Sequence, residues 1–265
     1  MSISDKGRFK QKRGRIDLRH PEKYLPWLFT RDGCKGDGTR HLLPDMFYEN
    51  RVLHLMSDLE KRIYYTLRSR RDYVIEIFEQ YPLLPLTATE EICDKNNIAH
   101  PAYPRNNNIV MTTDFLLIVK NKNNDLSYKA CAVKPSSKLG EKRIKQKLFV
   151  EEMYWKEKGI EFGVMTELDV NKQYVKNVIL CKKGYKGVGD RSAYDCVKFF
   201  IVNRIINVDM TKIIDLDKLI YDIKKGALLI DQKLLNEKRP IIDQRGEVVD
   251  ISEIENVLTN HQVRY

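Results

Sequence analysis

The stretch from Ile109 to Pro135 constrains the fold of this chain more than any other part of the sequence. β-branched and apolar residues cluster on both sides of a polar turn at residues 121–125. This pattern predicts two strands, over residues 110–120 and 126–134. Because the turn is short, the two strands should pair as an antiparallel hairpin.

The register of this hairpin brings two charged residues together. If Lys120 pairs with Leu126, then Asp114 lies opposite Ala132 and diagonal to Lys134 on the same face. A carboxylate and a lysine are therefore expected to share one surface of the sheet.

The pair of Asp114 and Lys134 allows two interpretations. The other face of the strands is apolar, which indicates a buried sheet: Phe115, Leu117, Val119, Cys131 and Val133. Since an unpaired buried charge is too costly to keep, the two residues must pair with each other or hold something charged. The first interpretation is a structural salt bridge between strands, and the second is half of a nuclease site. The hairpin alone leaves both open.

The composition narrows the class of protein. The 265 residues are 42% hydrophobic and 9% aromatic, which is enough to build a core in one or two domains. Lys and Arg outnumber Asp and Glu by 47 to 37, and this excess favours a polyanionic partner. The five cysteines are scattered without a C-x-x-C pair, so neither a disulfide framework nor a zinc ribbon is indicated. With no apolar run of membrane-spanning length, we expect a cytoplasmic protein that does not enter a membrane.

The N-terminal segment is strongly basic. Residues 1–23 contain eight Lys or Arg against three Asp or Glu, without a helical or strand period. This predicts either a mobile arm that lies along a DNA backbone, with Arg13 and Arg15 as candidate contacts, or solvated disorder. The apolar segment 24–28 should anchor the arm to the core. The glycine-rich segment 31–41 should be a turn or loop, and its glycines lack the spacing of a phosphate-binding loop.

A helix start supplies a further carboxylate. Ser57 is followed three residues later by Glu60, just before an apolar run, which is a capping box and predicts a helix from about Asp58. Glu60 should therefore point close to the buried side of that helix. It can serve as the cap alone or belong to a site.

A second helix is predicted over residues 139–158. Glu151 shares an apolar face with Ile144, Leu148 and Trp155, so it can lie near a site or pair with a lysine. The rest of the surface is basic, and it is either a solvated face or a DNA-backbone contact: Lys138, Lys142, Arg143, Lys145 and Lys147. A strand at 161–166 should end this unit.

Blocks of residues in the first 165 positions resemble the TnsA family, the endonuclease subunits of heteromeric cut-and-paste transposases. The resemblance is carried by residues 24–28 (YLPWL), 54–60 (HLMSDLE), 80–85 (QYPLLP), 100–101 (HP), 110–116 (VMTTDFL), 133–135 (VKP) and 154–155 (YW). These blocks follow the order of the family, whereas the C-terminal third matches only loosely.

The resemblance implies an α/β restriction-endonuclease-like catalytic domain, with a central mixed sheet flanked by helices, over residues 1–168. It places the catalytic roles on Glu60, Asp114 and Lys134. The cofactor would be Mg²⁺, with Mn²⁺ as a possible substitute, because a hard cation neutralises the charge that develops in phosphodiester hydrolysis. Restriction nucleases usually carry an acidic residue where this chain has Ala132, so only the Ala132 backbone carbonyl can ligate there. Glu60, Asp114 and, less directly, Glu151 would supply the carboxylate ligands.

Residues 169–265 are expected to form a second domain. A basic segment at 171–186 precedes three predicted helices and a hairpin that turns at Gln244-Arg245-Gly246. The helices are expected at 192–207, 216–225 and 227–237. Helices followed by such a hairpin suggest a winged-helix-like module, which would serve assembly or DNA contact.

The resemblance implies an enzyme that cleaves double-stranded DNA at the 5′ ends of a transposable element. Its partners would be a DDE-type transposase subunit and an AAA+ ATPase regulator, and its location the bacterial cytoplasm, at the nucleoid during transposition. Two alternatives remain from the residues themselves. One is a free-standing restriction-like or repair nuclease, and the other is a noncatalytic winged-helix DNA-binding regulator.

Overall fold

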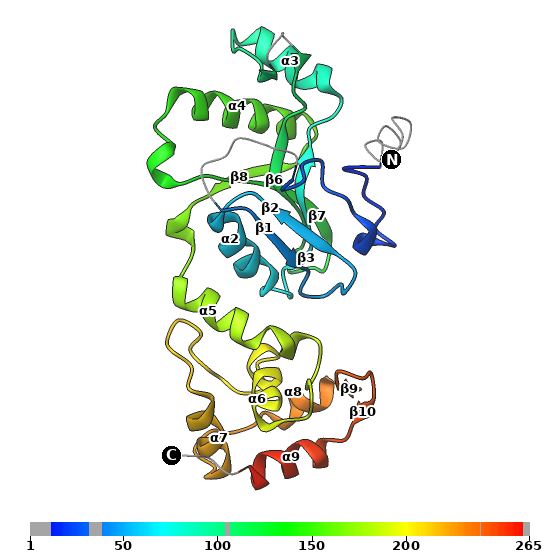
Figure 1. Cartoon of the computed structure of the whole chain (residues 1–265), viewed down its shortest axis with the longest axis vertical. Helices are drawn as coiled ribbons and strands as arrows, with labels where there is room; N and C mark the ends of the chain where they lie inside the picture. The colour runs from blue at the N-terminus through cyan, green and yellow to red at the C-terminus, as the bar shows by residue number, and fades with distance from the viewer. Residues whose placement is uncertain (1–11, 32–38, 104–106, 239, 262–265) are drawn as a thin grey trace. The chain divides into compact units, whose positions relative to one another are not determined.

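The predicted hairpin lies at the centre of a four-stranded sheet in the first of two units, residues 1–170 and 171–265 (Figure 1). In this computed structural model the described residues are 12–31, 39–103, 107–238 and 240–261. Each unit has its own hydrophobic core, and each is described by itself.

The sheet of the first unit is mixed. Its strand order is β3-β6-β7-β8, with strands β3 (Val74–Pro82), β6 (Thr112–Lys120), β7 (Leu126–Val133) and β8 (Glu161–Met165). Strand β6 is antiparallel to both of its neighbours, and Lys120 pairs with Leu126, which confirms the predicted register. Strands β7 and β8 are parallel and are joined through helix α4 (Lys142–Glu157).

Helix α4 belongs to the core of this unit. Tyr154 and Trp155 of α4 lie in one buried cluster with Leu116 and Ile118 of β6. Alternation along β6 puts Asp114 on the same face as Leu116 and Ile118. This face is therefore apolar over most of its length, and Asp114 lies near its end, at the start of β6. The expectation of a buried sheet is confirmed.

Smaller elements surround the sheet. Strands β1 (His41–Pro44) and β2 (Val52–Leu55) form an antiparallel pair, as do β4 (Ala102–Tyr103) and β5 (Asn107–Asn108). The helices are α2 (Asp58–Arg68) and α3 (Leu86–Lys95), with single 3-10 turns η1 (Pro21–Lys23), η2 (Ser136–Lys138) and η3 (Glu167–Asp169). Helix α2 starts where the capping box predicts.

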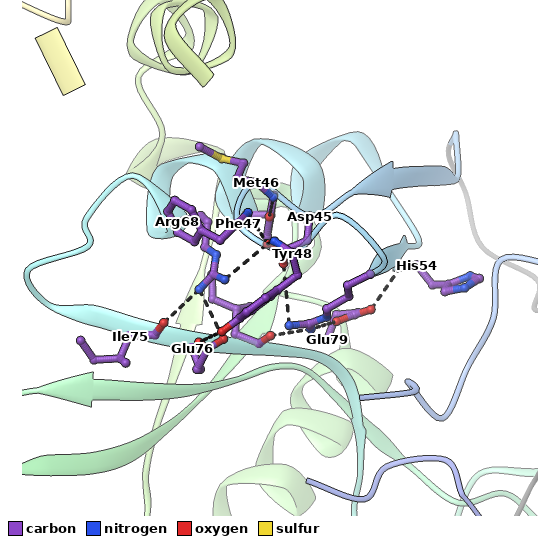
Figure 2. A network of polar contacts seen from close by, with 12 residues as sticks. Asp45, Met46, Phe47, Tyr48, His54, Arg68, Ile75, Glu76 and Glu79 are labelled. Carbon is purple, nitrogen blue, oxygen red and sulfur yellow. Dashed lines mark hydrogen bonds and ion pairs between the residues drawn. The ribbon is translucent and has the colours of Figure 1, made fainter. Parts of the chain in front are cut away.

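A buried network of ion pairs ties the segment before β2 to strand β3 (Figure 2). Arg51 lies 2.6 Å from Glu79 and 3.7 Å from Asp45. Arg68 lies 3.4 Å from Asp45 and 3.5 Å from Glu76. The Arg51 and Arg68 guanidinium groups also donate to the backbone carbonyls of Ile77 and Ile75. Because nearly all these side chains are buried, each charge depends on its partners to offset the loss of water.

The apolar anchor docks on the core as predicted. Tyr24 is buried against Phe78, and its hydroxyl donates to the Glu79 carbonyl at 2.9 Å. Arg13 donates to the Trp27 carbonyl at 2.9 Å and stacks on Phe29.

Residues 12–23 of the predicted arm 1–23 therefore lie against the unit, and the DNA contacts of the arm stay a prediction. These residues make defined contacts, and the Arg13 guanidinium already has partners within the unit. Arg15 is exposed and stays a candidate DNA contact. Residues 1–11, and 32–38 of the predicted glycine-rich loop, lie outside the described residues.

The second unit is mostly helical. Its elements are α5 (Lys172–Cys181), η4 (Lys182–Tyr185), α6 (Ala193–Val202), α7 (Leu216–Lys224), α8 (Gln232–Glu237), β9 (Ile241–Ile242), β10 (Val248–Val249) and α9 (Ile251–Asn260). Strands β9 and β10 are antiparallel, so the hairpin predicted around Gly246 is present. A cluster that includes Phe200, Ile220, Leu235 and Ile254 forms the core.

Several predicted boundaries were wrong. Helix α6 ends at Val202 and not at 207, because Asn203 caps it and Arg204 takes a left-handed conformation. Helix α8 begins only at Gln232, where the Asp231 side chain accepts the Leu234 N–H. Helix α4 begins at Lys142, three residues later than predicted, after the turn η2.

No helix among the described residues is long and apolar enough to cross a membrane.

Candidate active site

The charged residues predicted on the hairpin form a close pair. Lys134 Nζ lies 2.7 Å from Asp114 Oδ2, and it also donates to the Val133 carbonyl at 2.8 Å. The same Asp114 oxygen accepts the Val133 N–H at 2.6 Å. The Asp114 and Lys134 side chains are 15% and 23% exposed, so the pair is partly open to solvent. The predicted cross-strand salt bridge is present, and the pair lies at the accessible end of the sheet.

Glu60 both caps helix α2 and lies near this pair. Its backbone N–H donates to Ser57 Oγ, and its side chain accepts from the Ser57 hydroxyl at 3.0 Å and from the Met56 N–H at 2.8 Å. Burial, and then the charge of Asp114, raise the pKa of Glu60 to about 7. Glu60 can therefore both cap helix α2 and belong to the site.

Glu151 approaches from helix α4. It is buried, and it accepts a hydrogen bond from the Thr113 hydroxyl at 3.1 Å. Burial raises the pKa of Glu151 to about 8; Lys134 opposes this shift and Asp114 adds to it. Glu151 therefore lies near Asp114 and Lys134, as the first of its two interpretations expects.

Lys134 remains a cation in these surroundings. Burial alone would lower its pKa, but the carboxylates of Asp114, Glu151 and Glu60 outweigh burial and hold the pKa above the usual lysine range. Lys134 is therefore a hydrogen-bond donor and a positive charge at neutral pH, and it cannot act as a general base.

The carboxylates of this site suit a hard divalent cation. Burial raises the pKa of Glu60 and of Glu151. A nearby cation would stabilise the charged forms of both carboxylates. Within the described ranges, no three His, Cys, Asp or Glu side chains gather into a complete metal-binding group. Mg²⁺ fits such a sparse set, because it is usually bound through one or two carboxylates and keeps several waters.

Ala132 lies in β7 with its side chain fully buried. The Cys131 thiol donates to the Ala132 carbonyl at 3.5 Å, which is a weak contact. The Ala132 carbonyl as a metal ligand stays a prediction.

The basic residues of the α4 region differ in their surroundings. Lys142 and Lys145 are exposed, whereas Arg143 donates to the Ala99 carbonyl at 2.7 Å. Lys147 is half-buried one helical turn before Glu151. Burial, Arg143 and Lys134 together lower the pKa of Lys147, so its ammonium lies within electrostatic reach of Lys134. The helical spacing of Lys147 and Glu151 is the sequence signal for this placement.

The part of the chain that carries most of this cluster is similar to a family of endonuclease domains. Residues 71–167 match the family model described as TnsA-like endonuclease N terminal, a range that contains Asp114, Lys134 and Glu151 and begins after Glu60. The chain is also 34% identical over 171 residues to the transposon Tn7 transposition protein TnsA of Escherichia coli. That alignment covers 64% of this chain and 59% of the relative. This part of the chain is therefore similar to TnsA, in agreement with the resemblance seen in the sequence.

We predict that Glu151→Gln makes the metal-free protein less sensitive to alkaline pH. A carboxyl whose pKa is raised in the folded state binds its proton more tightly there than in the unfolded chain. The stability is therefore greatest below the unfolded pKa and falls as the pH rises toward the folded value of about 8. The wild type should lose about 2 kcal/mol between pH 6 and pH 8 through this group, and Glu151→Gln should not.

Urea unfolding without divalent metal at both pH values measures this difference. The matched control is Glu152→Gln, an exposed carboxylate on the same helix, which should follow the wild type. Parallel pH curves for Glu151→Gln and the wild type would contradict the buried ionisation of Glu151.

Proposed function

We propose that this chain is a metal-dependent DNA endonuclease that cleaves the 5′ ends of a transposable element during cut-and-paste transposition. The observation that carries the proposal is the 2.7 Å pair of Asp114 and Lys134 in a chain similar to TnsA. Burial raises the pKa of Glu60 and of Glu151, and both lie near enough that the charge of Asp114 raises it further. The chain aligns with only 59% of the relative's length, so activity, substrate and partners are proposed from the domain.

The residues of this chain divide the chemistry between them. Asp114 and Glu60 would hold Mg²⁺ or Mn²⁺, with Glu151 and the Ala132 carbonyl as further candidate ligands. When bound, the ion would neutralise charge on the scissile phosphate. Lys134 donates hydrogen bonds, so it orients the attacking water and stabilises negative charge on the phosphoryl oxygens. The products would carry a 3′-hydroxyl and a 5′-phosphate.

The partners are proposed from the similarity to a transposition protein. A subunit of this kind would act beside a DDE-type transposase that cuts the 3′ ends and under an AAA+ ATPase regulator. The second unit would then be the assembly module, with the winged-helix interpretation resting on its helices and on the β9–β10 hairpin. Among the described residues, all the contacts of the candidate site lie within the first unit.

The exposed basic residues of α4 are proposed to contact the DNA backbone together with Arg15, Lys138 and Arg143. We predict that Lys142→Ala with Lys145→Ala weakens DNA binding equally for all sequences and reduces the salt-dependence slope by about 2. Fluorescence anisotropy over a salt series measures both quantities. Lys95→Ala with Lys122→Ala removes two exposed charges outside α4 in this unit and is the control. An unchanged slope in the first variant would place the DNA on another face.

The experiment that tests the proposal is cleavage of end-labelled transposon-end DNA with Mg²⁺, in the presence and absence of the cognate transposase. We expect partner-dependent cutting at the 5′ ends, with 3′-hydroxyl and 5′-phosphate products. Cutting without the partner would indicate a free-standing nuclease instead. Binding without any metal-dependent cutting would indicate a DNA-binding regulator.

A further inference from the structure

We propose that Gln80 is a positioning residue that fixes the Glu60 carboxylate for metal binding. This inference rests on the proposed metal site around Asp114. Gln80 lies in strand β3, is 2% exposed, and joins helix α2 to strand β6 through its side-chain amide. No step of the chemistry described above uses this residue.

Both the nitrogen and the oxygen of the Gln80 side-chain amide form hydrogen bonds near the site. Its Nε2 donates to Glu60 Oε2 at 3.1 Å, and its Oε1 accepts from the Thr112 hydroxyl at 3.3 Å. Strand pairing places Gln80 between the Glu79–Phe115 and Tyr81–Thr113 pairs, so Asp114 is the residue across from it. Gln80 thus connects Glu60 to the strand that carries Asp114.

The contacts of Glu60 distinguish its two oxygens. Oε2 accepts two N–H groups, one from the Met56 backbone and one from Gln80. Among the described residues, Oε1 accepts from the Ser57 hydroxyl alone, which can rotate away. The Gln80 amide therefore anchors Oε2 and leaves Oε1 as the oxygen that can turn to a cation.

The backbone at Gln80 supports a specific role. Gln80 has a φ of +48°, a left-handed conformation that is uncommon for a residue with a side chain. Its carbonyl accepts the Trp27 N–H at 3.1 Å, which helps to hold this conformation. Such local strain is retained where the surrounding structure enforces it, and this occurs most often at functional sites.

The test is direct titration of the full chain with Mn²⁺, in which electron paramagnetic resonance measures the free ion. Gln80→Met keeps the length and the unbranched shape of the side chain but cannot donate to Glu60. We expect the Kd for Mn²⁺ to rise about tenfold to hundredfold, as is usual when a residue that orients a metal ligand is lost. Thr89→Val removes a buried hydroxyl elsewhere in this unit and should leave the Kd within about twofold, whatever it does to the Tm.

Two further variants separate the possible failures. Thr112→Val keeps Gln80 but frees its carbonyl end, so the Kd should rise by a smaller factor; this variant decides the matter if Gln80→Met does not fold. A wild-type Kd in the folded Gln80 and Thr112 variants would overturn the positioning role. If Asp114→Ala also binds Mn²⁺ like the wild type, the proposed metal site itself fails, and the inference fails with it.

Discussion

Replacing Lys134 with methionine should reduce DNA cleavage about hundredfold to thousandfold in the presence of the partner proteins. Methionine keeps most of the side-chain volume but removes the ammonium group that lies 2.7 Å from Asp114. Loss of one preorganised donor to developing negative charge typically has an effect of this size. Single-turnover cleavage of transposon-end DNA at saturating Mg²⁺ measures the change.

The matched control for Lys134 is another lysine of strand β7. Lys129 also forms a 2.7 Å ion pair, with Glu161, but this pair is more exposed. Lys129→Met should cleave at nearly the wild-type rate. If Lys134→Met lowers the stability but cuts as fast as the Lys129 variant, the Asp114–Lys134 pair is only a structural salt bridge.

Replacing Arg51 with methionine should destabilise the first unit by about 3–5 kcal/mol, because the change leaves the buried carboxylate of Glu79 without its ion-pair partner. Glu79 is fully buried and lies 2.6 Å from the Arg51 guanidinium, and Asp45 lies 3.7 Å away. The segment before β2 would lose the ion pair of Arg51 with strand β3 but would keep the hydrogen bond from Tyr48 to Glu76 (Figure 2). Urea unfolding monitored by circular dichroism measures the free energy of unfolding.

Two controls separate a buried charge from lost packing. Arg51→Met combined with Glu79→Gln removes the unpaired charge and should recover part of the lost stability. Arg19→Met removes an exposed ion pair with Asp17 and should change the stability by less than about 1 kcal/mol. Equal losses in the single and double Arg51 variants would show that the charge of Glu79 does not matter.

The local patterns of the sequence predicted much of the first unit. The hairpin register followed from a short polar turn between apolar runs, and the α2 start followed from Ser57 and Glu60. Both features depend on residues close together in the sequence. The register of this local hairpin also predicted that Asp114 and Lys134 lie on one face.

The interactions that were missed join residues far apart in the sequence. Arg51 pairs with Glu79, and Gln80 contacts Thr112, only because the chain folds β2 and β6 against β3. No pattern among neighbouring residues of the sequence predicts such pairs. The left-handed backbone of Gln80 is likewise invisible in a strand-like apolar run.

Helix α5 was interpreted only as a basic segment. Its lysines are conspicuous in the sequence, but Val175, Val178 and Cys181 form a buried stripe at helical spacing. Helix α9 follows the β9–β10 hairpin directly and was not predicted. Apolar residues recur at helical spacing in both segments, so both helices could have been predicted from the sequence.

We propose that Asp114 belongs to a metal-dependent DNA-cleaving site. The most direct measurement is Mg²⁺-dependent cleavage of transposon-end DNA, with the cognate transposase, by the wild type, Asp114→Ala and the exposed control Asp94→Ala. We predict 5′-end cutting by the wild type and by the Asp94 variant, and none by Asp114→Ala although it is folded. Cleavage by Asp114→Ala at the wild-type rate would contradict the assignment of this site.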